Sequence, residues 1–240
     1  MIKFVENDLY FNEFNDYAAL KIKILVKGYG FGYNFCRFWV QINESSVPTA
    51  IICMFYNGVT VSYNQEADYS ELKEFVEFLS PYEICIKNGL IGFNLPYKTV
   101  NCLYKKSSKT KDLEVLNQNY NTCKKAFELL NNPENDFGLS DFDSWYIDIN
   151  HRIRHNSAFV ISKEDSCAIC LTDGNDIIIN GIAVSIDRRG ENLGKKLLDE
   201  ISSYSNFDGI YVLCENKLVG FYKKSKFEII DKYCIYEGSL

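Results

Sequence analysis

The stretch INGIAVSIDRRGENLGKKLLDEI, residues 179–201, is the most informative about fold class, because its periodicity changes halfway along. The first part, up to Ile186, is an apolar run rich in β-branched residues, which is typical of a buried strand. A polar turn with two arginines and two glycines follows, and apolar residues then recur at the spacing of one helical face. We therefore predict a strand over 176–186 and a helix that opens near Gly194.

A strand that ends in such a turn before a helix is suited to bind an anion. The first backbone N–H groups of a helix lack intrahelical acceptors, and the helix dipole adds partial positive charge there. Glycine lets the backbone approach a ligand closely. Positive charge comes from Arg188, Arg189, Lys195 and Lys196. We expect a diphosphate as the ligand. On this stretch alone, an ordinary strand–helix connection is the alternative, because neither the P-loop nor the G-x-G-x-x-G pattern occurs.

The turn resembles the acetyl-CoA loop of the GNAT superfamily of N-acetyltransferases. The pattern of that loop is R/Q-x-x-G-x-G/A after a strand, and Arg189, Asn192 and Gly194 occupy its three named positions. Gly190 follows the arginine, as is frequent in the superfamily. Asn192 departs from the middle glycine, but asparagine tolerates a left-handed backbone better than most residues, so we expect the turn to keep its shape.

A second segment, ENKLVGFYKKSKFEII, resembles the superfamily pattern N-x-x-x-x-x-Y-x-x-x-G-F. Asn216, Tyr222 and Phe227 match the pattern, and Lys226 stands where glycine is usual. The two motifs occur in the expected order, and the resemblance covers roughly residues 100–240. It implies that this part of the chain binds acetyl-CoA as a cosubstrate.

The resemblance also implies roles for single residues. In the superfamily, the strand before the loop splays from its neighbour, and its backbone holds the pantetheine arm; the N–H near Val184 would polarise the thioester carbonyl. Tyr222 would donate a proton or hydrogen bond to the leaving thiolate, unless it is only a packed aromatic residue. The expected catalytic residues are thus Tyr222 and Val184. The expected cofactor-binding residues are Ile182, Ala183, Val184, Arg188, Arg189, Gly190, Glu191, Asn192, Leu193, Gly194, Lys195, Asn216 and Tyr222.

Both histidines of the chain lie in HRIRH at 151–155, four residues apart and thus on one helical face. In the superfamily this segment lines the acceptor site, so its basic groups would suit an acceptor that carries a carboxylate. They are His151, Arg152, Arg154 and His155. Two alternatives stay open: charges favoured by the end of a helix, and a zinc site, for which a third ligand is lacking. We expect no metal.

The general base is not readable from the sequence. Glu164, Asp165 and Asp176 are candidates by position only. Cys214, at the end of a predicted strand, is a candidate nucleophile or a packed thiol, and direct transfer without an acyl-enzyme is usual in the superfamily. The pair Cys167 and Cys170 has C-x-x-C spacing but no second pair or flanking histidine, which favours strand core over metal or redox use.

The chain reads as two copies of one α+β unit. Each half follows the order strand, helix, antiparallel strands, helix, strand, so we expect a mixed, mainly antiparallel sheet flanked by helices. The expected domains are 1–99 and 100–240. In the first, the loop before the helix at 68–79 is NQEAD, without glycine or arginine and with two acidic residues that repel phosphate. It is therefore a degenerate copy that binds no CoA.

Local signals predict several elements of the first half and the middle of the chain. Asn57-Gly58 predicts a hairpin turn because both residues tolerate positive φ. Asp68 or Ser70 is the expected N-cap of the second helix. Hydrophobic spacing predicts helices over 8–26, 68–79, 113–131 and 141–155.

Composition limits the class of protein. The 240 residues are 47% hydrophobic, which allows a packed core without disulfides or metals, and the net charge of −6 argues against a nucleic-acid partner. The first residues do not form a secretory signal, and no window has the apolar length of a membrane span. Nine scattered cysteines suit a reducing compartment, so a cytoplasmic location is expected.

These observations predict an N-acetyltransferase that moves an acetyl group from acetyl-CoA directly to a primary amine of a small molecule or peptide. Nucleic acid and membrane are not expected partners, and the oligomeric state is open. The first alternative is a non-catalytic acyl-CoA-binding or sensing module. The second is an aminoacyl-tRNA-dependent transferase, which also uses doubled folds of this type.

Overall fold

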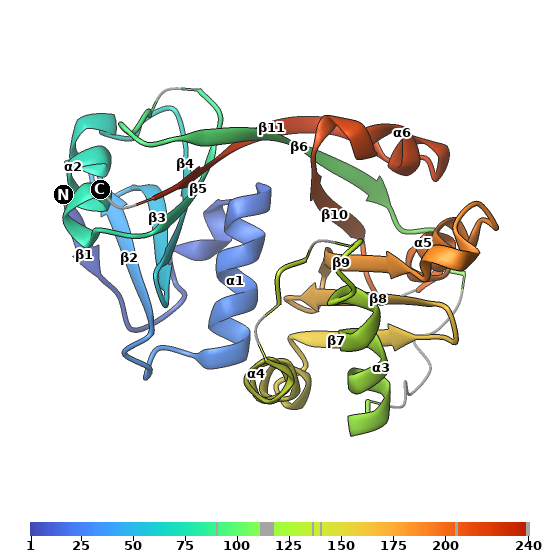
Figure 1. The fold of residues 1–240 in the computed structure, drawn as a ribbon. Helices are drawn as coiled ribbons and strands as arrows, with labels where there is room; N and C mark the ends of the chain where they lie inside the picture. Colours follow the sequence, from blue (N-terminus) through green and yellow to red (C-terminus); the bar gives the residue numbers. More distant parts are fainter. Residues whose placement is uncertain (90, 111–117, 136, 140, 205, 239–240) are drawn as a thin grey trace. The chain divides into compact units, whose positions relative to one another are not determined.

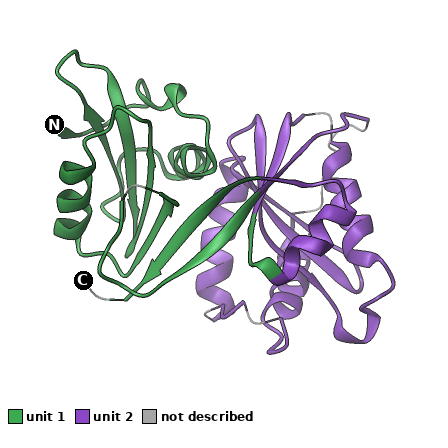
Figure 2. Cartoon of the chain, turned by 90° about the horizontal axis from the view of Figure 1, so that it is seen from above, with its two compact units in different colours: residues 1–102, 213–216, 230–240 green, residues 103–212, 217–229 purple. Residues whose placement is uncertain are grey.

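The computed structural model describes residues 1–240 except 90, 111–117, 136, 140, 205 and 239–240. Contacts divide the chain into two compact units (Figure 2). Unit 1 comprises residues 1–102, 213–216 and 230–240, and unit 2 comprises residues 103–212 and 217–229. Each unit is discontinuous because strands β6 (Tyr97–Lys106), β10 (Gly209–Cys214) and β11 (Glu228–Glu237) contribute residues to both. The assignment of functions to 1–99 and 100–240 stays a prediction.

Unit 1 is a sheet with strand order β1-β2-β3-β4-β5-β11. Its strands pair antiparallel except β4 and β5, which are parallel and are connected through α2. The elements are β1 (Ile2–Phe4), a 3₁₀ turn η1 (Phe11–Glu13), α1 (Tyr17–Tyr29), β2 (Cys36–Ile42), β3 (Pro48–Phe55), β4 (Gly58–Tyr63), α2 (Tyr69–Leu79) and β5 (Glu83–Lys87) (Figure 1).

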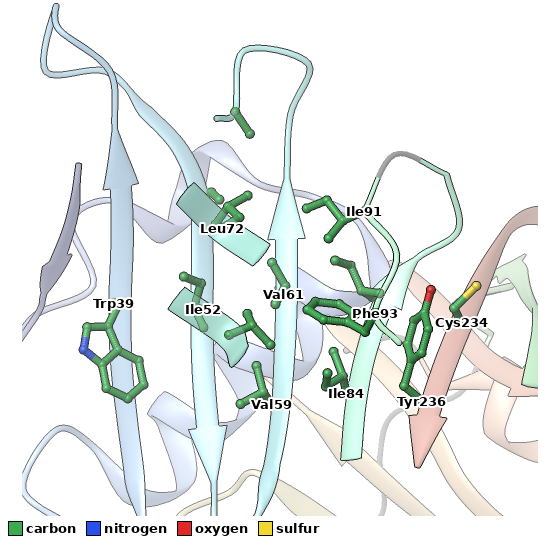
Figure 3. Packing of buried hydrophobic residues seen from close by; sticks show 14 residues of the cluster. Trp39, Ile52, Val59, Val61, Leu72, Ile84, Ile91, Phe93, Cys234 and Tyr236 are labelled. Atoms are coloured by element: carbon green, nitrogen blue, oxygen red, sulfur yellow. The ribbon is translucent and has the colours of Figure 1, made fainter. Parts of the chain in front are cut away.

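Both faces of this sheet are buried, because successive side chains of a strand point to opposite sides. Ile52 lies in the cluster that Leu72 of α2 covers, together with Trp39 and Tyr236 (Figure 3). Its neighbour Ile51 lies in a second cluster that contains residues of α1. Alternating apolar residues on β2 and β3 thus produce a core on each side of the sheet.

Unit 2 has the strand order β6-β10-β9-β8-β7. β7, β8 and β9 form an antiparallel meander, and β10 pairs parallel with β9 after α5. The elements are α3 (Tyr120–Leu130), α4 (Phe142–Arg154), β7 (Ala158–Ser162), β8 (Ser166–Thr172), β9 (Asp176–Val184), a 3₁₀ turn η2 (Ile186–Arg188), α5 (Leu193–Ser203) and α6 (Asn216–Lys224).

Helices cover both faces of the unit 2 sheet as well. Cys167 Sγ on β8 lies 3.5 Å from the Ala126 carbonyl oxygen of α3, which identifies the α3 face. Val184 at the end of β9 lies on the α5 face, beside Gly194. Each unit therefore contains three antiparallel strands, a helix and a parallel strand in the same order, which confirms the α+β class, the mainly antiparallel sheet and the repeat.

Several predicted elements differ from the structure at their ends. The helix expected over 8–26 is η1 followed by α1, because Asp16 caps the helix start by accepting a hydrogen bond from Ala19 N. In the hairpin, Tyr56 rather than Gly58 has positive φ, and Gly58 already pairs with Phe55. Of the two expected N-caps of α2, Asp68 is the one observed. The strand expected over 176–186 ends at Val184. Part of the helix expected over 113–131 lies outside the described residues, and α3 forms its second half.

Candidate functional site

The parallel strands β9 and β10 separate partway along their length. Their pairing covers only Asp176–Ile178 of β9 and ends there, although β9 continues to Val184. On its other side, β9 stays paired with β8 up to Val184. The register shifts between Ile169 and Cys170 of β8, and Asn180 is the additional residue of β9, a bulge that redirects the strand. The end of β9 is thus paired on one side.

The register shows which backbone groups this separation leaves available. Ser185 N donates to the Asp165 carbonyl, and in an antiparallel pair such bonded positions alternate with non-bonded ones. Ala183 is therefore bonded to β8. Ile182 and Val184 direct their N–H and C=O groups away from β8, toward the side where the pairing with β10 has ended. Of the three predicted pantetheine residues, two have backbone groups suited to a ligand.

The turn after β9 contains two residues with positive φ. Gly190 has φ +91°, and Asn192, the N-cap of α5, is left-handed with φ 61° and ψ 16°. The first intrahelical bond runs from Lys196 N to the Asn192 carbonyl, so the N–H groups of residues 193–195 lack intrahelical acceptors. The Asn192 side chain does not cap them. Asn192 thus adopts a left-handed backbone at the position of the motif glycine.

Close packing against α6 explains why residue 194 is a glycine. A Cβ at this position would lie 3.0 Å from Cζ of Phe221 and 3.5 Å from Cγ2 of Val184. Phe221 belongs to α6, so the glycine lets that helix approach the start of α5. A larger side chain at residue 194 would therefore contact Phe221.

The two arginines of the turn already have protein partners. Arg188 donates to Asp165 Oδ2 at 2.8 Å and to both carboxylate oxygens of Glu191 at 2.8 Å. Hydrogen bonding to Arg188 lowers the pKa of Glu191, so this carboxylate is charged at neutral pH. Arg189 donates to the Asn135 Oδ1 at 2.5 Å. The charge expected at the turn from Arg188 is therefore balanced by two carboxylates.

Tyr222, Lys226 and Phe227 together end α6. Phe227 N donates to the Tyr222 carbonyl at 3.2 Å, and Lys226 N donates to the Lys223 carbonyl at 3.0 Å. These two bonds, with Lys226 left-handed at φ 65°, define a Schellman motif. The rings of Tyr222 and Phe227 are 5.6 Å apart and make the apolar contact that accompanies it. The Y-x-x-x-G-F pattern is thus a helix stop, with a lysine at the glycine position.

The structure places the remaining predicted cofactor residues as follows. Tyr222 is buried, 4% exposed, and also contacts Phe221. Lys195 is exposed in the first turn of α5. Asn216 belongs to unit 1, where its Oδ1 accepts a hydrogen bond from Asn101 Nδ2 at 2.8 Å.

The basic segment expected at the acceptor site forms the last turn of α4. The rings of His151 and His155 lie 4.5 Å apart on one face, as their spacing predicts. Arg152 is buried and donates from Nε to Asp148 at 2.9 Å, so it stabilises the helix. Arg154 and His155 are exposed. Within the residues that the structure describes, no group of three metal-ligating side chains occurs.

Ion pairing, position or burial argues against a catalytic role for Asp165, Asp176 and the candidate thiols. Asp165 is paired with Arg188, and Asp176 begins β9, about 26 Å along the strand from Val184 at ~3.3 Å per residue. Burial raises the pKa of the Cys214 thiol to about 11, which disfavours a thiolate nucleophile. All nine cysteines are buried, and none of them forms a disulfide bond. Cys167 and Cys170 are three apart on a strand and therefore point to opposite faces.

In unit 1, the strand pair and helix start that correspond to β9, β10 and α5 form hydrogen bonds with side chains of the same unit. The parallel pairing of β4 with β5 ends at Val61. Beyond it, the Tyr63 hydroxyl donates to the Lys87 carbonyl at 3.4 Å. The start of α2 is also satisfied, because Asp68 Oδ1 accepts hydrogen bonds from the N–H groups of Ser70 and Glu71, both at 3.0 Å. A carboxylate of the protein thus lies where unit 2 has an uncapped helix start.

No protein-family model matches the sequence, and no curated protein does. Solved structures match the fold. An acetyltransferase of the GNAT family from Colwellia psychrerythraea shares 12% identity, with a TM-score of 0.52 and 99% of each chain covered. A GCN5-related N-acetyltransferase from Kribbella flavida shares 8%, with a TM-score of 0.57 and 95% of each chain covered. A tandem GNAT protein from the clavulanic acid biosynthesis pathway shares 7%, with a TM-score of 0.56, 100% of this chain and 98% of that one covered. The chain therefore has the GNAT fold.

Among the described residues, no helix combines the length and the apolar character that crossing a bilayer requires.

Three features of the site were not predicted from the sequence. They are the bulge at Asn180, the contact of Phe221 with Gly194, and the pairing of Arg188 with Asp165. A glycine next to Asn180 in an apolar strand was the available signal for the bulge.

Proposed function

We propose that this chain, which has the GNAT fold, is an N-acetyltransferase that takes acetyl groups from acetyl-CoA in unit 2 and transfers them directly to a primary amine. Unit 1 binds no CoA. The acceptor is a small molecule or a peptide, and neither nucleic acid nor membrane takes part.

The observation that carries the proposal is the difference between two equivalent helix starts. In unit 1, the start of α2 is capped by the carboxylate of Asp68. In unit 2, the start of α5 follows the left-handed Asn192, whose side chain makes no cap. Uncapped N–H groups at the positive end of a helix favour a phosphate, and a capping carboxylate excludes one. The diphosphate of CoA would bind at residues 190–195.

The separated strands support the remainder of the cofactor site. Ile182 and Val184 direct backbone N–H and C=O groups away from β8, which suits the amide groups of a pantetheine arm. The Val184 N–H is the donor that would polarise the thioester carbonyl, because a fixed backbone dipole stabilises the charge that develops on oxygen. Ala183 contributes packing, since its backbone groups bond to β8.

Transfer forms a C–N bond and breaks a C–S bond, so a proton leaves the amine and a proton or hydrogen bond meets the thiolate. Tyr222 is the proposed donor to the sulfur. A phenol has an ordinary pKa near 10, so it is protonated at neutral pH. The Schellman motif fixes the backbone of Tyr222 at the end of α6, which gives its ring a defined position.

His151, Arg154 and His155 are the proposed contacts to the acceptor. They form a basic edge at the end of α4, which would attract an acceptor that carries a carboxylate. Arg152 is not among the proposed acceptor contacts, because it is buried and bound to Asp148.

The proposal is tested by calorimetry and a turnover assay on the full chain. Acetyl-CoA should bind with a stoichiometry of one, and CoA release should depend on an amine from a panel with and without carboxylates. A stoichiometry of two would refute the assignment of unit 1. Tight binding without turnover on any amine would favour the acyl-CoA-sensing alternative.

A further inference from the structure

A groove on the surface of unit 2 gathers lysines from three parts of the chain. Its volume is about 710 Å³, and its walls come from one side of α5, the end of α6 and the end of β6. This volume lies within the range of ~300–1,000 Å³ that is usual for small-molecule sites. The lysines that line it are Lys105, Lys106, Lys195, Lys224 and Lys226.

The groove is positively charged although the chain has a net charge of −6. Its five lysines are accompanied by two carboxylates, those of Asp199 and Glu228. Lys105 Nζ lies 3.6 Å from Asp199 Oδ1, so one carboxylate is engaged. The other four lysines form no ion pair within the part of the chain that the structure describes. The groove thus has an unbalanced positive charge.

The ammonium group of Lys105 is repelled by two other lysines of the groove. Burial lowers the pKa of Lys105, and the positive charges of Lys226 and Lys195 lower it further, against the opposing effect of Asp199. The side chain of Lys105 is held in place, since it lies over the ring of Phe227, with Nζ 5.7 Å from the centroid. An anion bound among these groups would remove the repulsion.

A buried hydroxyl without a partner lies in the same groove. Ser225 is 2% exposed, and its Oγ makes no hydrogen bond to any described residue. Its backbone is fixed by the bond from Ser225 N to the Tyr222 carbonyl at 2.9 Å. An unsatisfied buried hydroxyl is unfavourable and indicates a missing partner. An anionic oxygen would accept its hydrogen bond.

We propose that this groove binds a phosphate monoester, with Lys105, Lys195 and Lys226 around the phosphate and Ser225 donating to it. The site differs in construction from the diphosphate cradle, because side chains form it rather than backbone N–H groups. The phosphate belongs either to bound CoA, as its 3′-phosphate, or to a separate phosphorylated molecule of nucleotide size.

Binding is measured by calorimetry on the full chain at low ionic strength, with inorganic phosphate and adenosine 3′,5′-bisphosphate as separate probes. Dephospho-CoA is present in excess in the phosphate titration only, because its adenosine would compete with that of the bisphosphate. Lys226→Gln should weaken both probes about tenfold, and Ser225→Ala should weaken them about threefold, as expected for lost charge-assisted and neutral hydrogen bonds. Lys223→Gln is the matched control, because this lysine is exposed in the last turn of α6 and does not line the groove. It should change affinity less than about twofold.

Two results would overturn the proposal: neither probe binds saturably, or the control weakens binding as much as Lys226→Gln does. A comparison of CoA with dephospho-CoA identifies the source of the phosphate. If CoA supplies it, CoA competes with inorganic phosphate, and Lys226→Gln weakens CoA but not dephospho-CoA. If the ligand is separate, saturating CoA leaves phosphate binding unchanged. Phosphate binding without acetyl transfer would reject the proposed enzyme and retain this site.

Discussion

Replacement of Lys226 by glycine should make unit 2 more stable, although it removes a long side chain. Lys226 occupies the left-handed position of the Schellman motif that ends α6, with φ 65°. Every residue with a Cβ is strained in this conformation, and glycine is not. The residue is exposed and forms no ion pair with a described residue, so no stabilising contact is lost.

The magnitude follows from two opposing effects. Left-handed backbone costs an L-residue about 1–2 kcal/mol, which the substitution recovers. The greater freedom of glycine in the unfolded chain lowers the free energy of unfolding by about 0.5–1 kcal/mol. The free energy of unfolding should therefore rise by about 0.5–1 kcal/mol. The control is Lys223→Gly, in the regular helix three residues earlier, which should lower it by about 0.5–1 kcal/mol.

Urea unfolding followed by tryptophan fluorescence measures both variants. The chain has two tryptophans, Trp39 in unit 1 and Trp145 in unit 2. In a Trp39→Phe background, the signal reports unit 2 alone. If Lys226→Gly were no more stable than its parent, or if both glycine variants changed stability with the same sign, the left-handed cap would be the wrong explanation of the motif.

Three further predictions concern the site. Val184→Pro removes an N–H that does not bond to β8, so it should lower kcat by about 10²–10³-fold while the fold is retained. Ala183→Pro removes an N–H that does bond to β8 and should unfold the end of β9. Circular dichroism measures the fold of both variants, and a turnover assay measures kcat. Tyr222→Phe keeps the contact with the Schellman cap and should lower kcat about 10–10³-fold with little change in KM for acetyl-CoA, and an unchanged, chemistry-limited rate would reject the role. Gly194→Ala should destabilise the fold by about 1–3 kcal/mol through its contact with Phe221, and Phe221→Leu should restore part of the loss in thermal melts.

Local conformation was predictable where one residue determines it. Asn192 is left-handed at the position of a motif glycine, and Asp68 caps α2, because both outcomes depend on the backbone preferences of a few neighbouring residues. The spacing of leucines likewise predicted the buried face of α5. Such features follow from periodicity and capping chemistry alone.

Long-range pairing was not predictable in the same way. The sequence predicts that Arg188 binds a phosphate, but Arg188 pairs with Asp165, which lies 23 residues away on a turn whose position depends on the strand register. Register also determines that the backbone of Ala183 bonds to β8 while the backbone groups of Ile182 and Val184 point away from it. A shift of one residue would exchange the bonded and free groups. A sequence without an alignment contains no direct signal for either pairing.

The two units differ in whether the helix start after the third antiparallel strand is capped by the protein. In both, a parallel strand pair stops partway, which leaves backbone groups and a helix start without partners from the sheet itself. Unit 1 satisfies them internally, with the hydroxyl of Tyr63 on the Lys87 carbonyl and the carboxylate of Asp68 on α2. Unit 2 has no such cap at α5, so its helix start needs water or a ligand. Since buried polar groups are rarely left unpaired, the open unit is the one expected to bind a cofactor.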